Sequence, residues 1–129
     1  METLPETVTT YYDLQDRLID LAVRIAAICD DLPPTRVGKH VAGQLVRCST
    51  APAPLHAEAN AAESRKDFIH KLGLCLKELR ETMSWLCYVQ RLEIGDASAV
   101  DQAVEDTDRA IATVFTSIRT AKRNDKLKA

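Results

Sequence analysis

The chain has 129 residues, which is the length of one domain. Its 46% apolar and 28% charged residues exclude a chain that is disordered throughout, and only four glycines with 5% aromatic residues favour helices packed through aliphatic side chains. The formal net charge of −2 argues against a surface that is basic all over, as strong nucleic-acid binding would require.

Residues 1–10 contain acids and Pro5 but no basic start and no apolar run, so we expect neither a secretory nor a transit signal. No apolar stretch approaches the ~18–20 residues that span a bilayer. We therefore predict a cytoplasmic protein with no membrane partner. In that compartment the four cysteines, Cys29, Cys48, Cys75 and Cys87, are expected to be reduced thiols that pack in the core, because their spacing matches no recurrent zinc motif.

The first predicted helix covers residues 11–31. Thr10 and Asp13 resemble a capping pair at its start, and Pro33 and Pro34 end it because proline disfavours helical geometry in the residue before it. Its aliphatic residues recur at helical spacing: Leu14, Leu18, Leu21, Ile25 and Ile28.

The second predicted helix begins after Thr35, which is a favourable capping residue. Its apolar stripe consists of Val37, Val41, Leu45 and Cys48. Pro52 and Pro54 predict a kink or a break, because each proline removes a backbone donor and clashes with the preceding turn. A short helical piece over residues 55–61 would continue it.

The third predicted helix, residues 65–91, has the strongest periodicity and would be about 40 Å long. Ser64 and Asp67 form its capping pattern. A turn at Gly95 and Asp96 follows, and Ser98 with Asp101 would cap a fourth helix. The stripe of the fourth helix consists of Val100, Val104, Ile111, Val114, Phe115 and Ile118.

Four amphipathic helices joined by short turns, with no alternating strand pattern, predict an all-α, up-down-up-down four-helix bundle with a proline kink in helix 2. We expect a single domain over residues 1–129, with flexible termini at 1–10 and 123–129. Several apolar residues lie beside the main stripes and widen the apolar arcs of the first and third helices. A homo-oligomer would bury this surplus, and a broad core arc is the alternative. The residues concerned are Ala22, Ala26, Ala27, Trp85, Cys87 and Tyr88.

Charge alternates in sign along the chain. Residues 1–32 carry seven acids against two bases, and residues 33–91 carry nine bases against five acids. Residues 92–118 carry six acids against one base, and residues 119–129 carry five bases against one acid. Antiparallel neighbours of opposite sign would screen one another within a bundle.

The sequence resembles the bacterial four-helix-bundle proteins linked to 23S ribosomal RNA intervening sequences. The resemblance is close at residues 64–72 and 76–82 and at Trp85-Leu86, and looser at Leu32-Pro33, residues 44–47, Thr50, Glu58-Ala59 and residues 117–122, so it spans most of the chain. Leu55 replaces the asparagine usual in the family, and Pro54 adds a second proline.

This resemblance implies an up-and-down four-helix protomer, often assembled as a ring of five, with no established enzymatic activity. Some similar proteins are accessory subunits of diversity-generating retroelements, in which a basic pentamer binds a reverse transcriptase and RNA. The present chain lacks their strong positive charge, so the resemblance implies that role only weakly.

Motifs for catalysis and metal binding are not found. His40, His56 and His70 are far apart, and no two carboxylates or cysteines lie beside any of them at metal-ligand spacing on one helix face. No phosphate loop, Glu-x-x-His pair or nucleophile elbow occurs. We therefore predict no enzyme, no metal, no cofactor and no small-molecule substrate.

Two sets of polar residues remain as candidate sites. The family resemblance implies that Arg47, Glu58 and Asp67 converge, either as a structural ion-pair cluster or as a binding pocket. A basic set would contact a partner or RNA phosphates, unless interleaved acids such as Glu78 and Glu81 pair with it along the helix. This set is Arg65, Lys66, Lys71, Lys77, Arg80, Arg119, Lys122 and Arg123.

Two functional hypotheses follow. The first is a non-enzymatic homo-oligomeric scaffold or adaptor, with a pentamer favoured by the resemblance. The second is an RNA-associated protein, acting on ribosomal RNA or with a reverse transcriptase, that binds phosphates through the third helix and the C-terminal bases.

Overall fold

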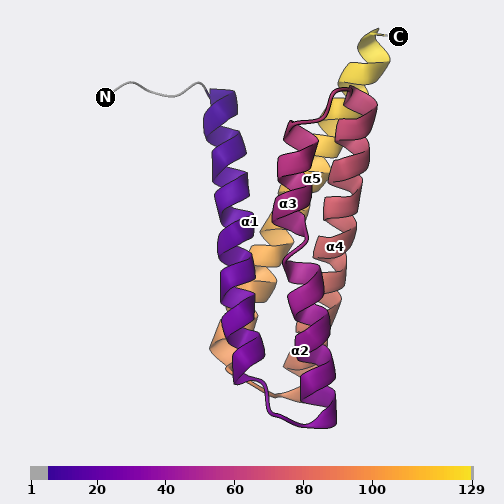
Figure 1. Cartoon of the computed structure of the whole chain (residues 1–129). Helices are drawn as coiled ribbons and strands as arrows, with labels where there is room; N and C mark the ends of the chain where they lie inside the picture. Colours follow the sequence, from indigo (N-terminus) through magenta and orange to yellow (C-terminus); the bar gives the residue numbers. More distant parts are fainter. Residues whose placement is uncertain (1–5, 129) are drawn as a thin grey trace.

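The computed structural model describes the backbone of residues 6–128 and the side chains of residues 13–126. Within that range the chain is all-α and has no strand. Its helices are α1 (Glu6–Asp31), α2 (Arg36–Ser49), α3 (Pro52–Asn60), α4 (Arg65–Leu92) and α5 (Ala97–Lys128). Because α3 continues along the same edge as α2, the chain forms a four-helix bundle of antiparallel rods (Figure 1).

The order of the rods around the bundle follows from their contacts. The α2–α3 rod and α5 each pack against both α1 and α4. Helices α1 and α4 therefore lie on one diagonal, and the α2–α3 rod faces α5 across the other. The start of α1, the turn between α3 and α4 and the end of α5 lie at the same end of the molecule (Figure 1).

Aliphatic side chains from every rod fill the core. Most of each apolar stripe predicted from the periodicity is confirmed, because burial selects the residues that recur on one side of a helix. Val37 and Phe115 were expected in these stripes but are 43% and 46% exposed, because they lie at the edge of the buried side of their helices. Complete burial of one such side chain stabilises the fold by about 1.5–3 kcal/mol. Side chains with under 2% exposure include Leu18, Ile25, Leu45, Leu72, Leu79, Leu86 and Val114.

Two of the four predicted helix caps are confirmed. The Thr35 hydroxyl accepts a hydrogen bond from the amide of Gly38 at 3.0 Å, and the Ser64 hydroxyl accepts one from the amide of Asp67 at 3.0 Å. The predicted cap at Ser98 is wrong, because the Asp96 carboxylate accepts from the amide of Ala99 at 3.2 Å and α5 begins at Ala97. The predicted cap at Thr10 is also wrong, since α1 already begins at Glu6.

The connections are tight enough to require particular backbone geometry. A Cβ atom on Gly38 would overlap the carbonyl oxygen of Pro33, so glycine permits the close turn from α1 into α2. Glu93 and Gly95 adopt left-handed φ angles of 55° and 73° and reverse the chain between α4 and α5.

The sequence predicts a kink or a break around Pro52 and Pro54, and the structure describes two helices separated by Thr50 and Ala51. The Thr50 hydroxyl donates to the carbonyl oxygens of Val46 at 2.7 Å and Arg47 at 3.2 Å, which satisfies acceptors at the end of α2. Pro52 begins α3, where its missing N–H costs nothing.

The termini were expected to be flexible over residues 1–10 and 123–129. Residues 1–5 and 129 lie outside the described part, whereas 6–10 and 123–128 are helical, and the flexibility of these helical ends stays a prediction. Among the described helices, none has an apolar segment of the length that crossing a membrane requires.

Candidate functional site

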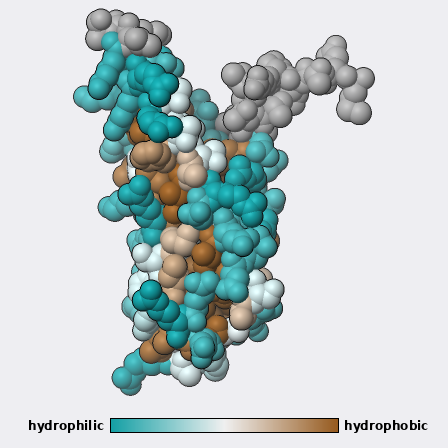
Figure 2. Space-filling model, turned by 180° about the vertical axis from the view of Figure 1, so that it is seen from behind, coloured by the Kyte–Doolittle hydropathy of each residue, from teal (hydrophilic) through white to brown (hydrophobic). Residues whose placement is uncertain are grey.

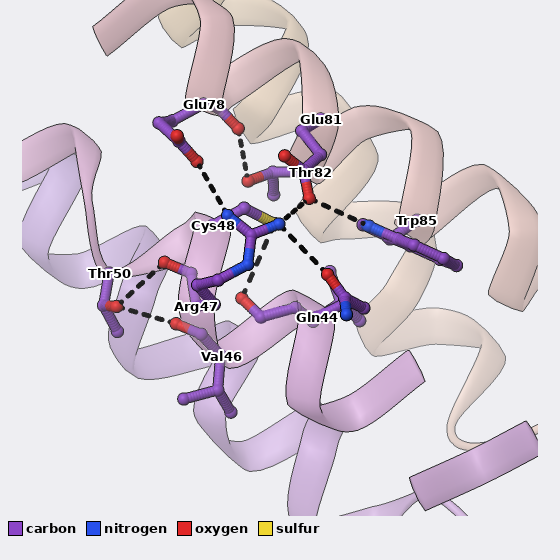
Figure 3. Close-up of polar contacts among 10 residues, drawn as sticks. Gln44, Val46, Arg47, Cys48, Thr50, Glu78, Glu81, Thr82 and Trp85 are labelled. Atoms are coloured by element: carbon purple, nitrogen blue, oxygen red, sulfur yellow. Dashed lines mark hydrogen bonds and ion pairs between the residues drawn. The ribbon is translucent and has the colours of Figure 1, made fainter. Parts of the chain in front are cut away.

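Arg47 is the centre of a polar cluster between α2 and α4 (Figure 3). Its Nη2 donates to Gln44 Oε1 at 3.0 Å and to Oε2 of Glu81, and its Nη1 lies 3.7 Å from Glu78 Oε2. Trp85 Nε1 donates to the same Glu81 oxygen at 3.2 Å. One guanidinium therefore holds two carboxylates, and one of those carboxylates orients an indole ring.

The two carboxylates outnumber the guanidinium, so the cluster carries excess negative charge. The side chains of Glu78 and Glu81 are only 22% and 33% exposed. Oε2 of Glu78 is buried and has no hydrogen-bond partner, so its stabilisation depends on the charge of Arg47.

The structure corrects the predicted convergence of Arg47, Glu58 and Asp67. Glu58 forms an ion pair with Lys71 at 3.8 Å. The backbone amide of Asp67 donates to the hydroxyl of Ser64, which caps α4. The reason is the antiparallel register of the α2–α3 rod on α4, which sets Arg47 beside the middle of α4 and Glu58 nearer its start. The acids that pair with Arg47 are Glu78 and Glu81. Their spacing in the sequence also allowed them to pair with basic residues of their own helix.

An exposed aromatic surface adjoins the cluster. Trp85 makes edge-to-face contacts with His40 and Tyr88, with ring centroids 5.8 and 5.9 Å apart. The antiparallel register brings two more apolar side chains to the same end, and Val37, Tyr88 and Leu92 are 43%, 43% and 37% exposed. We call the five residues Val37, His40, Trp85, Tyr88 and Leu92 the α2–α4 face.

A second apolar surface lies on the other side of α2, between α1 and the start of α3. It is a groove of about 490 Å³ whose walls include Ala22, Ala26, Ala53 and Pro54. Ile19 and Val23 line it and are 45% and 64% exposed, far more than core residues. The sequence pattern identified the two alanines of α1 but not Ile19 and Val23, although both lie off the core stripe of that helix. We call this surface the α1–α3 groove.

The predicted basic residues divide among three places. Lys71 pairs with Glu58 next to α3, and Arg65 lies in the wall of a hollow at the end of the bundle. The other six are exposed and make no ion pair with any residue whose side chain is described: Lys66, Lys77, Arg80, Arg119, Lys122 and Arg123.

These six residues gather along the outer side of α4 and α5, which we call the basic face. Gln90 donates to Asp101 at 2.8 Å, and this antiparallel register sets the first half of α4 beside the second half of α5. Arg119 lies 5.8 Å from the ring centre of Phe115, which is 46% exposed. From behind the bundle, Figure 2 shows a column of apolar side chains between hydrophilic flanks.

Buried groups offer little reactive chemistry. Burial raises the pKa of the Cys75 thiol to about 12, and that of Cys29 to about 11. Burial lowers the pKa of His56, whose Nδ1 lies 2.6 Å from Gln15 Oε1. Among the described residues, no three His, Cys, Asp or Glu side chains form a cluster suited to a metal ion.

A family of known proteins matches most of the chain. The family model described as 23S rRNA-intervening sequence protein matches residues 12–115, from the first turns of α1 to the middle of α5. The chain belongs to this family. The 23S rRNA-intervening sequence family assignment agrees with the resemblance seen in the sequence.

A solved structure supports the same fold. It is the crystal structure of a protein with unknown function from the S23 ribosomal protein family of Bacteroides thetaiotaomicron, which is 28% identical, with a TM-score of 0.75. The match covers 81% of this chain and 97% of that one. No curated protein matches the chain. Neither the matched family nor this solved relative is assigned an enzymatic reaction by name.

Proposed function

We propose that the protein is a cytoplasmic, non-enzymatic scaffold or adaptor that works as a homo-oligomer. The observation that supports this is the pair of exposed apolar surfaces, the α2–α4 face and the α1–α3 groove. In a monomer both surfaces are exposed to water. Association that covers them is stabilised by about 25 cal/mol of free energy per Å² of apolar surface buried.

The two surfaces differ in shape and composition. The α1–α3 groove is lined by small side chains such as Ala22, Ala53 and Pro54, whereas the α2–α4 face presents the rings of Trp85 and Tyr88. An aromatic surface of one protomer seated in this groove of another makes a head-to-tail contact, and such contacts close into rings when the rotation allows. The family resemblance favours a ring of five.

Each surface is tested by one charged substitution at an exposed position. Val23→Glu blocks the groove and Tyr88→Glu blocks the α2–α4 face. Light scattering is expected to show an oligomer for the wild type and a monomer for each variant. Phe115→Glu is the matched control, because it alters an equally exposed apolar side chain outside both surfaces, and it should remain oligomeric.

Mixing the two blocked variants tests the head-to-tail pairing. Each retains one intact surface, so an equimolar mixture should form a dimer and nothing larger. A wild type that stays monomeric at tens of micromolar contradicts the homo-oligomer. A wild-type oligomer whose blocked variants do not pair contradicts only the head-to-tail arrangement.

The basic face supports RNA binding as a second function. The acids that would have paired with Lys77 and Arg80 along α4 are turned toward Arg47 on α2 instead. The bases of the outer side are therefore left free to neutralise phosphates.

Salt dependence measures this function. Binding of a 20-nucleotide single-stranded RNA should weaken between 50 and 200 mM salt. The logarithm of the binding constant should fall linearly with the logarithm of the salt concentration, with a slope of about −0.7 per phosphate contact. Lys122→Gln with Arg123→Gln should reduce the slope by about 1.4. Lys71→Gln, on the opposite side of α4, should leave it unchanged. Absence of binding at 50 mM salt would exclude this function.

A further inference from the structure

A hollow of about 620 Å³ lies at the end of the bundle where the turn joins α3 to α4. Its wall combines the last turn of α3, the first turns of α4 and the C-terminal half of α5. The volume is in the range of small-molecule sites, which often lie between the helices of bundles. None of its wall residues belongs to the α2–α4 face, the α1–α3 groove or the basic face.

The wall has an apolar part and a polar part. Ala59, Phe68 and Ala121 supply apolar surface, and Thr116, Thr120 and Asn124 supply polar side chains. Within the described part of the chain, Thr116, Thr120 and Asn124 make no side-chain hydrogen bonds, so their donors and acceptors are available. Such a wall suits a ligand with an apolar body and polar substituents.

Arg65 adds a guanidinium group to the wall, and one nitrogen of that group is unsatisfied. Its Nη1 atom is buried and has no hydrogen-bond acceptor. No described carboxylate lies within ion-pair distance of Arg65, although Glu63 belongs to the same wall. A buried donor without an acceptor costs about 1–3 kcal/mol, and more when the group is charged. A ligand that offers an anionic oxygen, met by a small rotation of the side chain, removes this cost.

We infer that the hollow is a binding site for a small amphiphilic organic anion. Its anionic group pairs with Arg65, its polar substituents meet Thr116, Thr120 and Asn124, and its apolar body packs on Phe68. This site goes beyond the proposed function and is independent of it, because it is made entirely by one protomer.

The probes are 8-anilinonaphthalene-1-sulfonate and the neutral N-phenyl-1-naphthylamine, which share an aromatic body and differ in the sulfonate. Fluorescence titration should show the sulfonate binding about tenfold more tightly, as one charge-assisted hydrogen bond allows. Arg65→Gln should remove this preference without weakening the neutral probe. Lys66→Gln is the matched control, because it removes the adjacent charge, which is outside the wall, and it should change nothing.

Two further measurements locate the site. Thr120→Trp places an indole in the hollow and should abolish binding of both probes, and amide chemical shifts on binding should move at residues 59–68 and 116–124. The titration is repeated in Val23→Glu, which excludes the α1–α3 groove as the source of fluorescence. Competition by 1-naphthyl phosphate and by 1-naphthoate then separates phosphate esters from carboxylates. Equal affinity for the two probes, or shifts confined to other surfaces, overturns the inference.

Discussion

Arg47 on α2 and Glu81 on α4 form an ion pair whose carboxylate also accepts the indole N–H of Trp85. Because Trp85 in turn contacts His40 and Tyr88, this pair sets the orientation of the rings on the α2–α4 face. The Arg47–Glu81 pair therefore both links α2 to α4 and orients the aromatic rings.

Arg47→Met should lower the free energy of unfolding by about 1–2 kcal/mol, since it leaves Glu78 and Glu81 close together without a counter-charge. Urea unfolding at pH 7 measures this. Adding Glu78→Gln should restore about half of the loss by relieving the repulsion. Arg17→Met removes an exposed ion pair to Asp13 and should cost under about 0.5 kcal/mol. Equal losses for the two arginines would contradict a special role for Arg47.

Gly38→Ala should destabilise the protein by about 2 kcal/mol or more, because the new Cβ meets the carbonyl oxygen of Pro33. Gly73→Ala is the opposite case. A Cβ there meets nothing within 4 Å, so better helix propensity should stabilise the protein by about 0.5–1 kcal/mol. Thermal unfolding of the two variants should shift in opposite directions, and a neutral Gly38→Ala would show that the turn relaxes.

His56 predicts a pH dependence of stability. Its pKa is lowered by burial from the ordinary value of 6.5, so the unfolded chain binds the proton more readily than the folded one. Its contribution to stability is therefore present above pH 6.5 and is lost as the pH falls through the lowered pKa. Urea midpoints between pH 7.5 and 5.5 should fall less steeply for His56→Gln than for the wild type.

The cysteines should differ in reactivity toward a disulfide reagent such as Ellman's. Cys87 is half-buried, whereas Cys29, Cys48 and Cys75 are buried and their pKa values are raised by that burial. At pH 8 one thiol per folded chain should react quickly, and the other three should react only after unfolding. Cys87→Ser should remove the fast phase, and a second fast thiol would contradict the packing.

Much of the fold was predictable because helix signals are local. The start of α4 at Arg65 follows from Ser64 and its capping bond to Asp67, and the core stripes follow from helical spacing. The sequence predicts the start of α5 too late along the chain because Asp96 and Ser98 are both good capping residues, and local sequence does not rank them.

The candidate sites were less predictable because their partners depend on register between helices. Glu78 and Glu81 are spaced to pair with bases along α4, yet they pair with Arg47 across the bundle. The α1–α3 groove requires the break at Thr50 and Ala51 to set Ala53 and Pro54 opposite Ile19. No pattern in one helix contains that information.

Acidic segments, residues 1–32 and 92–118, form α1 and most of α5, which pack together, whereas the basic residues 33–91 form α2, α3 and α4. The formal net charge of −2 therefore conceals a transverse electric dipole across the bundle. An isoelectric point near 5.9 describes neither side of the bundle. Both anion-exchange and cation-exchange resins should therefore retain the protein at the same neutral pH, each by a different side.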